Sequence, residues 1–161
     1  MSTEILIKKV TKTNFDSFIN LLEKMALFED QSHPDSAAKK RLKEDALSKN
    51  PKYEAFIANL GSQDIGFMII YPTYSSFLAL PSLFLEDIFV LKEFRKQRIG
   101  QKMFDYCVKL AKDRDCGRME WWTLNWNMPA INFYKKNNAT RTNNIFYQLS
   151  KKQIDEHVSN S

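Results

Sequence analysis

The chain has 161 residues, of which 43% are hydrophobic and 13% aromatic, and these proportions are typical of one folded domain rather than a disordered segment. No apolar stretch approaches the ~20 residues that a membrane-spanning helix needs, and the first residues lack the layout of a secretory signal. We therefore expect a single cytoplasmic domain over residues 1–161 with no membrane partner, a core at residues 5–150 and a polar C-terminal tail at residues 151–161.

The formal net charge of +5 is compatible with a nucleic acid, an anionic surface or a phosphate-bearing cofactor as partner. The cationic residues are scattered, and their two local groups, at residues 39–43 and 95–98, do not alternate with aromatic residues as a nucleic-acid stacking platform would. The two cysteines and two histidines are too few for a metal site of conventional spacing. We expect that the protein binds neither nucleic acid nor metal.

The first half of the chain predicts two helices and three strands. Apolar residues recur at helical spacing after Thr13, which we expect to be an N-cap with Asp16 in the capping-box position. The predicted elements, in order, are a strand at residues 5–10, a helix that runs to about Phe28, a charged helix at residues 35–49, and strands at residues 53–60 and 65–71 around a hairpin turn.

The second half of the chain alternates strand and helix patterns. Asn127 is expected to cap a helix that has Pro129 in its first turn and ends at Asn137 and Asn138, where Asn takes the left-handed position often held by Gly. The predicted elements are a strand at residues 83–90, a helix from Ile99 to near Gly117, a strand at residues 118–124, the helix after Asn127, and a short strand at residues 145–149. This order predicts a mixed α/β sheet with helices on both faces.

The turn between the strand at residues 83–90 and the following helix is basic, and residues 95–100 read RKQRIG. The N-terminus of a helix presents N–H groups and a partial positive charge, which together bind pyrophosphate. A solvated basic helix start has the same composition. The position of this turn between a strand and a helix favours the phosphate-binding interpretation.

Glu86 and Asp87 form an acidic pair within an apolar strand. Adjacent side chains of a strand point to opposite faces, so only one of the two should face a given cleft unless a bulge intervenes. A primary ammonium has a pKa of about 10.4 and must lose a proton before it attacks a carbonyl carbon, so a carboxylate at a cleft can act as its general base. A structural carboxylate paired with Lys or Arg is the alternative.

The run from Leu83 to Gly100, LFLEDIFVLKEFRKQRIG, resembles the acyl-CoA-binding core of the GNAT superfamily of N-acetyltransferases, and NMPAINFYKKNNA at residues 127–139 matches the family pattern Asn-x-Pro-x-x-x-Phe-Tyr. The similarity is to spermidine/spermine- and thialysine-acetyltransferase-like proteins. It is strongest from Leu83 to Ala139. The phosphate motif Gln/Arg-x-x-Gly-x-Gly/Ala matches at Arg95 and Gly100, whereas Arg98 stands where the family usually has its first Gly.

The resemblance implies an α/β fold with a mixed, mostly antiparallel central sheet flanked by helices. It also implies a V-shaped split between the fourth and fifth strands, after a bulge near Glu86. Acetyl-CoA would be the co-substrate, without a metal. Its pantetheine arm would pair with the backbone of the fourth strand inside the split, and its pyrophosphate would lie at the basic turn.

The resemblance also implies roles for individual residues. Glu86 would act as the general base or position a water that does so, and Tyr134 would be the general acid, although periodicity alone makes Phe133 and Tyr134 core aromatics. The residues implied for acetyl-CoA binding are Ile88, Phe89, Val90, Arg95, Lys96, Gln97, Arg98, Ile99, Gly100, Gln101, Asn127, Pro129, Ala130 and Tyr134. The residues implied for acceptor binding are Phe28, Glu29, Glu86, Asp87 and Glu120, of which Glu29 and Glu120 fit exposed structural carboxylates equally well.

The implied function is acetyl-CoA-dependent N-acetylation, by direct attack, of the primary amine of a small molecule such as a polyamine, a diamine or a thialysine- or lysine-like amino acid. Ser75 stands where polyamine-acetylating members carry Asp, which weakens the case for a long polycation. A homodimer is expected. The alternatives are a non-catalytic acyl-CoA-sensing or protein-binding module, and an acetyltransferase of protein lysines or N-termini.

Overall fold

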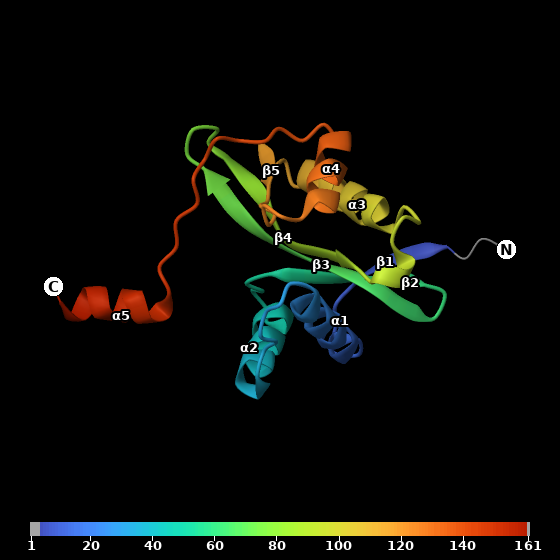
Figure 1. The fold of residues 1–161 in the computed structure, drawn as a ribbon, viewed down its shortest axis with the longest axis horizontal. Helices are drawn as coiled ribbons and strands as arrows, with labels where there is room; N and C mark the ends of the chain where they lie inside the picture. The colour runs from blue at the N-terminus through green and yellow to red at the C-terminus, as the bar shows by residue number, and fades with distance from the viewer. Residues whose placement is uncertain (1–3, 161) are drawn as a thin grey trace. The chain divides into compact units, whose positions relative to one another are not determined.

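The computed structural model describes residues 4–160 and has a five-stranded sheet with helices packed against it (Figure 1). The strand order is β1-β2-β3-β4-β5, and each pair is antiparallel except β4 and β5, which are parallel. The strands are β1 (Ile5–Lys9), β2 (Glu54–Leu60), β3 (Gln63–Ser75), β4 (Leu80–Val90) and β5 (Arg118–Glu120). The predicted mixed, mostly antiparallel sheet is confirmed.

Five α-helices and one short 3-10 turn complete the described chain. They are α1 (Phe15–Phe28), α2 (Ser36–Leu47), the 3-10 turn η1 (Lys92–Phe94), α3 (Ile99–Asp113), α4 (Met128–Lys136) and α5 (Lys151–Ser159). The chain divides into two compact units, one that ends at Trp122 and one that begins at Thr123. The first unit contains the whole described sheet with α1, α2 and α3, and the second contains α4 and α5. The organisation as one domain stays a prediction.

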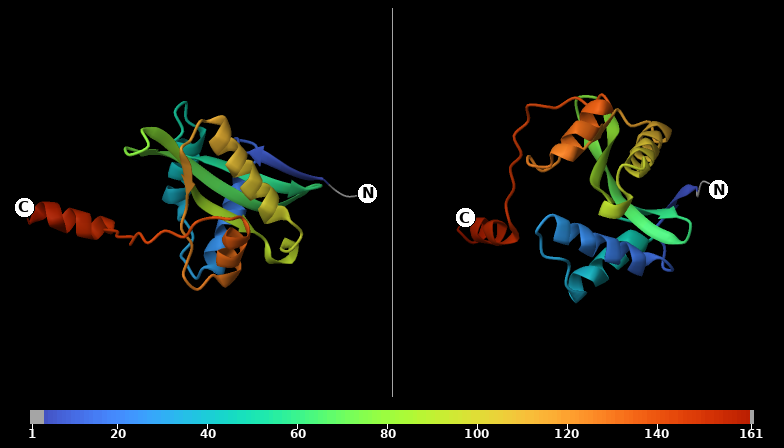
Figure 2. Two further views of the ribbon diagram at one scale, coloured as in Figure 1. Left: turned by 90° about the horizontal axis from the view of Figure 1, so that it is seen from above. Right: turned by 45° about the vertical axis from the view of Figure 1, so that its right-hand side comes forward.

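Helices cover both faces of the sheet, as predicted, with α1 on one face and α3 on the other (Figure 2). Two neighbouring residues of β3 show how this arises, because successive side chains of a strand point to opposite faces. The Phe67 ring packs edge-on against Phe18 of α1, with 5.5 Å between ring centroids. The sulfur of Met68 lies 3.3 Å from the Cys107 sulfur of α3. Cys107 is buried and is a packing residue, as its place on the apolar stripe predicts.

The core beneath α1 joins this helix to the end of β4. Its buried residues are Val10, Phe15, Phe18, Ile19, Leu21, Tyr53, Ala55, Ile57, Phe67, Ile69, Phe89 and Leu91. Burial of each large apolar side chain contributes about 1.5–3 kcal/mol to the free energy of unfolding. Because Phe89 and Leu91 belong to this core, the chain leaves β4 from a fixed position before it enters the basic turn.

The predicted start of α1 is wrong, whereas the predicted start of α2 is confirmed. Asn14, not Thr13, is the N-cap of α1, and the predicted capping box with Asp16 is wrong. The Asn14 amide oxygen instead accepts a hydrogen bond from the Thr11 backbone N–H at 2.7 Å, which closes the turn ahead of the helix. The helix predicted at residues 35–49 is confirmed as α2, and the Asp35 carboxylate caps it by accepting from the Ala38 N–H at 2.7 Å.

The end of the chain departs from the prediction. Residues 145–149 are not a strand, and α5 occupies the predicted polar tail. A strand needs a partner, and residues 123–160 include no strand with which this apolar segment could pair. Ser150 and Gln153 form a capping box that starts α5, and Lys151 and Asp155 form an ion pair one turn apart. β5 is also shorter than the predicted strand at residues 118–124.

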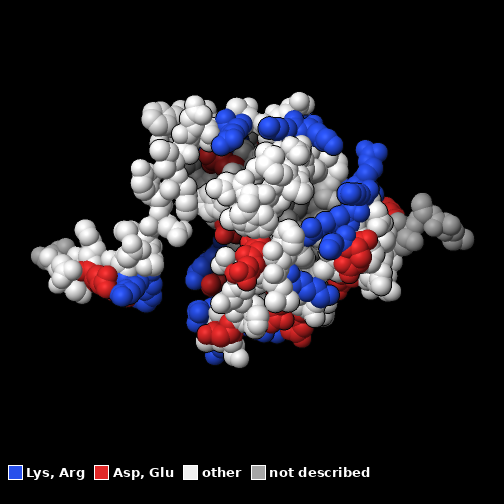
Figure 3. All heavy atoms as spheres, in the orientation of Figure 1, with Lys and Arg blue, Asp and Glu red and all other residues white. Residues whose placement is uncertain are grey.

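Helices of membrane-spanning length and hydropathy are absent from residues 4–160. Lys and Arg side chains are interspersed with Asp and Glu on the face drawn in Figure 3, as the scattered charges of the sequence indicate.

Candidate functional site

A β-bulge places Glu86 opposite no residue of β3. Asp87 pairs with Ile69 and Leu85 pairs with Ile70, so Glu86 is the extra residue on β4. The phenol O–H of Tyr71 donates to the Glu86 carboxylate at 2.8 Å, and Tyr71 follows Ile69 by two positions on β3. Side chains two positions apart lie on the same face of a strand. The bulge predicted near Glu86 is therefore confirmed, and both carboxylates lie on one face.

Glu29 lies close enough to this pair to interact with it. Burial raises the pKa of Asp87 to about 7, and repulsion from Glu86 and then Glu29 adds to the effect. Burial also raises the pKa of Glu29, which is the C-cap residue of α1. We refer to Glu29, Glu86 and Asp87 as the acidic cluster. It brings together three of the residues predicted to bind the acceptor, and its negative charge would attract a cationic amine.

Tyr71 is a member of this site that the sequence did not reveal. Its ring stacks on Phe84, with centroids 5.1 Å apart and an interplanar angle of 22°, and Phe84 makes an edge contact with Trp122 at 4.7 Å. The pKa of Tyr71 is raised, first by burial and then by the hydrogen bond to Glu86 and the charges of Glu86 and Asp87. The phenol therefore stays protonated at neutral pH and remains a hydrogen-bond donor.

The sheet splits next to the acidic cluster. β5 pairs with Ser82, Leu83 and Phe84 of β4, and within the described chain the last pair joins Phe84 to Glu120. β4 continues beyond this pair to Val90. The V-shaped split between the fourth and fifth strands is therefore confirmed. Among residues 4–160, no strand lies beside the edge of β4 that turns away from β3 after Phe84, so an extended ligand could pair with its backbone there.

The basic turn bends through two left-handed residues before α3. Lys96 and Arg98 both have φ of 63°, and Arg98 is the N-cap of α3, where its side chain makes no capping hydrogen bond. Lys96, Gln97 and Arg98 are exposed. Left-handed turns and helix N-termini are the two backbone features that bind anions. Arg98 thus adopts the left-handed backbone conformation for which Gly is suited.

The Arg95 side chain contacts the end of β4 and the end of α1. Its Nε–H donates to the Val90 carbonyl at 2.9 Å, and its guanidinium carbon lies 4.5 Å from the Phe28 ring centroid and 5.6 Å from that of Phe89. The Val90 carbonyl, one of the groups predicted to meet pantetheine, thus has a partner within the chain. Arg95 connects the basic turn to the end of α1, where Glu29 lies. Its predicted contact with pyrophosphate stays a prediction.

The second unit carries the remaining residues predicted for acetyl-CoA. The Asn127 side chain accepts from the Ala130 N–H at 3.3 Å and caps α4, with Pro129 in the first turn, as predicted. α4 ends at Lys136 with Asn137 as its C-cap, and the next residue, Asn138, has the predicted left-handed conformation with φ of 58°. Tyr134 makes an edge contact with Phe133 at 5.4 Å between ring centroids. Because Tyr134 belongs to this unit, its action beside Glu86 stays a prediction.

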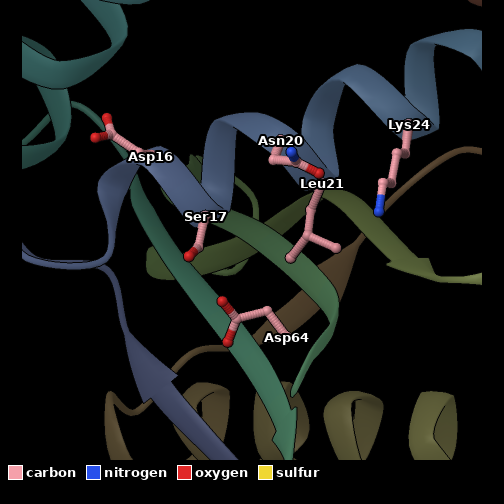
Figure 4. A pocket seen from close by; sticks show the side chains of 6 residues that line it. All are labelled: Asp16, Ser17, Asn20, Leu21, Lys24 and Asp64. Atoms are coloured by element: carbon pink, nitrogen blue, oxygen red, sulfur yellow. The ribbon is translucent and has the colours of Figure 1, made fainter. Parts of the chain in front are cut away.

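Glu120, whose predicted part in acceptor binding stays a prediction, and a surface pocket are two further features of the first unit. Glu120 forms an ion pair with Arg118 at 3.1 Å. A pocket of about 310 Å³ lies against α1, where Ser17 and Asp64 point toward one another (Figure 4), and its lining includes none of the predicted site residues. Among residues 4–160, no group of three or more His, Cys, Asp or Glu residues could hold a metal ion.

Comparisons with known proteins bear on this arrangement. The family model described as Acetyltransferase (GNAT) family matches residues 15–139. Thialysine N-epsilon-acetyltransferase of Mus musculus is 26% identical over 137 residues, which cover 80% of each chain. L-ornithine N5-acetyltransferase of Arabidopsis thaliana is 33% identical over 99 residues, which cover 60% of this chain and 43% of the relative. A solved aminoglycoside N-acetyltransferase in complex with CoA shares the fold, with a TM-score of 0.78, 21% identity and coverage of 94% and 97% of the two chains.

Proposed function

This chain belongs to the acetyltransferase (GNAT) family, and from that premise we propose that it moves the acetyl group of acetyl-CoA to the primary amine of a small molecule. The observation that carries the proposal is the bulge in β4. It turns Glu86 and Asp87 to one face beside Glu29, next to the point where β4 and β5 part. A cationic amine attracted by these carboxylates would meet the thioester at the split.

The acidic cluster would prepare the amine for attack. A primary ammonium has a pKa of about 10.4 and is not nucleophilic until it loses a proton. Glu86, exposed and held by Tyr71, would take this proton directly or through a water. Asp87 lies beside it with a pKa raised to about 7, so the cluster can hold a proton near neutral pH. The amine would then attack directly, with no covalent enzyme intermediate.

The co-substrate would bind along β4 beyond its pairing with β5 and at the turn into α3. Acetyl-CoA supplies a thioester whose carbonyl carbon is the electrophile. The backbone of Ile88, Phe89 and Val90 lies on the part of β4 beyond the β5 pairing, and its N–H groups would polarise the carbonyl as an oxyanion hole does. Residues 95–101 would hold the pyrophosphate at the turn into α3. Asn127, Pro129 and Ala130 would line the pantetheine arm.

Tyr134 would protonate the departing thiolate. An ordinary phenol has a pKa of about 10, so it is protonated at neutral pH and can hand its proton to the sulfur as the carbon–sulfur bond breaks. The thiol formed has an ordinary pKa of about 8.5, so this transfer is uphill by about 1.5 pKa units, and the phenolate takes a proton back from water. Phe133, next to it on α4, makes an edge contact with the Tyr134 ring and would be a packing residue.

The acceptor we favour is a small amine with its reactive nitrogen at the end of an alkyl chain. The relatives named for thialysine and ornithine act on such amines by their names. Ser75 supports the choice, because it is 2% exposed and its hydroxyl accepts from the Leu78 N–H at 3.2 Å. Ser75 therefore offers no charge to a second ammonium. A thialysine- or ornithine-like amino acid or a diamine fits this site better than a long polyamine.

We also propose a homodimer. Large apolar side chains remain exposed in each unit, among them Phe77 at 101% and Tyr147 at 84%, and a second copy could cover them. Size-exclusion chromatography with light scattering would test it, and a monomer at micromolar concentration would contradict it. The proposed location is the cytoplasm.

A thiol-release assay tests the acetyltransferase proposal. Acetyl-CoA would be mixed with the protein and with thialysine, ornithine, lysine, a diamine, spermidine or short peptides. We expect free CoA with the amino acids or the diamine. Release with peptides alone would indicate a protein acetyltransferase. Tight acetyl-CoA binding without release for any amine would indicate a non-catalytic module and overturn the proposal.

A further inference from the structure

Tyr71 is the polar side chain that meets the Glu86 carboxylate. The phenol O–H donates to Glu86 Oε2 at 2.8 Å, across the pair of strands that carries the bulge. Glu86 is exposed, and none of the ion pairs within residues 4–160 includes it. An exposed glutamate without such a partner populates several rotamers, whose ordering costs up to about 2 kcal/mol of free energy. The hydrogen bond from Tyr71 selects one of them before the acceptor arrives.

The Tyr71 ring is itself held in place. It stacks on Phe84, which is 8% exposed, and Phe84 contacts Trp122 edge to face. Tyr71 and Phe84 are also paired residues of β3 and β4, so the backbone ladder fixes the spacing of their rings. The hydroxyl is therefore presented to Glu86 by a rigid support, which is what a donor needs to orient a catalytic group.

We propose that Tyr71 is a positioning residue for acetyl transfer, which holds the Glu86 carboxylate in the orientation that receives the proton of the acceptor amine. This inference rests on the proposed function, in which Glu86 is the base. Tyr71 does not exchange a proton with the substrate. Its own pKa is raised, by burial first and by its acidic neighbours next, so it donates one hydrogen bond throughout the neutral pH range.

A double-mutant cycle tests whether Tyr71 acts through Glu86. Tyr71→Phe keeps the ring stack and removes the donor, and Glu86→Gln keeps an acceptor and removes the charge. Tyr71→Phe removes a hydrogen bond to a charged group, and we therefore expect it to lower kcat/KM about tenfold, mostly through kcat. In the Glu86→Gln background we expect Tyr71→Phe to have no further effect. An unchanged kcat/KM in the single variant, or an equal loss in both backgrounds, would overturn the inference.

Tyr53→Phe is the matched control. The Tyr53 hydroxyl also makes a hydrogen bond within the first unit, to the Leu42 carbonyl at 2.7 Å, and it lies in the core rather than at the acidic cluster. Its loss should lower the melting temperature and leave kcat/KM unchanged. If Tyr53→Phe and Tyr71→Phe lowered activity in proportion to their loss of stability, the effect of Tyr71 would be structural and the inference would be wrong.

A second measurement does not depend on turnover. The tyrosine ring carbons can be followed by NMR through the alkaline range near pH 10, with the Tyr71 signal assigned by its loss in Tyr71→Phe. In the wild type Tyr71 should titrate at higher pH than exposed tyrosines, and Glu86→Gln should lower its pKa. If Glu86→Gln leaves the titration of Tyr71 unchanged, the two groups do not interact and the inference fails. A wild type that shows this coupling but releases no CoA with any amine would refute the proposed function instead.

Discussion

The guanidinium of Arg95 lies over the ring of Phe28, 4.5 Å from its centroid, and so ties the first residue of the basic turn to the last residue of α1. Its Nε–H also donates to the Val90 carbonyl at the end of β4. The turn proposed for pyrophosphate and the helix end that carries Glu29 therefore share one internal support. A change at Arg95 should affect both stability and acetyl-CoA binding.

Arg95→Lys should lower the free energy of unfolding by about 1–3 kcal/mol. A lysine has no donor at the position of the arginine Nε and cannot reach the Val90 carbonyl while its ammonium lies over the Phe28 ring, so one hydrogen bond and most of the cation–π contact are lost. Urea unfolding measures the stability, and we expect the KM for acetyl-CoA to rise several-fold. Lys96→Gln is the control, because Lys96 is exposed and its replacement should change stability by less than about 0.5 kcal/mol. Equal stability of the two variants would contradict this account.

Arg98→Gly should stabilise the protein. Arg98 has φ of 63° and therefore lies in the left-handed region. A residue with a side chain in this region lowers the free energy of unfolding by about 1–2 kcal/mol. Glycine relieves this strain but has more conformational freedom in the unfolded chain, so we expect a net gain of about 0.5–1 kcal/mol in the free energy of unfolding.

Gln97→Gly is the matched control for Arg98→Gly. Gln97 lies between two left-handed residues but is not left-handed itself, so glycine there should cost about 0.5–1 kcal/mol. Urea unfolding measures the free energy of unfolding of both variants, which we expect to rise in Arg98→Gly and to fall in Gln97→Gly. A loss of stability in both would show that residue 98 does not require the left-handed conformation.

The features of the site that depend on residues close together in the sequence could be predicted, whereas contacts between residues far apart in the sequence could not. The strand, basic turn and helix at residues 83–113 follow from patterns of neighbouring residues, as do the cap at Asn127 and the left-handed residue Asn138 after α4. The roles of Tyr71 and Arg95 depend instead on partners far along the chain. Tyr71 meets Glu86 only because the bulge sets the register of β3 and β4. Register of this kind is fixed by the whole sheet and not by any one segment.

The errors of the sequence prediction have equally physical causes. Residues 145–149 carry a strand-like apolar pattern, but such a pattern forms a strand only where a neighbouring strand offers hydrogen bonds. The helix start was misplaced by one residue because Thr and Asn are both common at N-caps. Asn14 is the N-cap, but its side chain caps no N–H of the helix and instead accepts a hydrogen bond from the Thr11 N–H.

Asp87→Asn should remove a pH dependence from the stability of the protein. Burial, with repulsion from Glu86 and Glu29, raises the pKa of Asp87 from 3.8 to about 7 in the folded state. Between these values the folded protein holds a proton that the unfolded chain has released, so the contribution of Asp87 to stability is complete below about pH 4 and is lost as the pH rises to about 7. The total loss is on the order of 4 kcal/mol, since each pH unit between the two pKa values corresponds to about 1.4 kcal/mol.

Urea unfolding between pH 4 and pH 8 measures this effect, and Asp87→Asn should gain stability over the wild type as the pH rises. Glu4→Gln, which removes the same charge from an exposed position, should follow the wild-type curve. Parallel curves for Asp87→Asn and the wild type would mean that Asp87 is solvated in the folded protein, and the acidic cluster would lose its central member.

Tyr134→Phe should lower kcat by about 10²-fold and leave the affinity for acetyl-CoA almost unchanged. The substitution keeps the edge contact with the Phe133 ring, so α4 and its cap at Asn127 should remain intact. The phenol hydroxyl is lost, and the thiolate would then have to leave without an acid. Steady-state kinetics gives kcat, and calorimetry with CoA gives the affinity.

Tyr147→Phe is the control, since Tyr147 belongs to the same unit and is 84% exposed, so that its hydroxyl should not affect turnover. A parallel loss of kcat in both variants would point to a general effect on the second unit. Unchanged turnover in Tyr134→Phe would remove Tyr134 from the mechanism and leave protonation of the thiolate to water. A rise in the dissociation constant of CoA with kcat retained would make Tyr134 a binding residue, because only an interaction made in the transition state lowers kcat without weakening the ground-state complex.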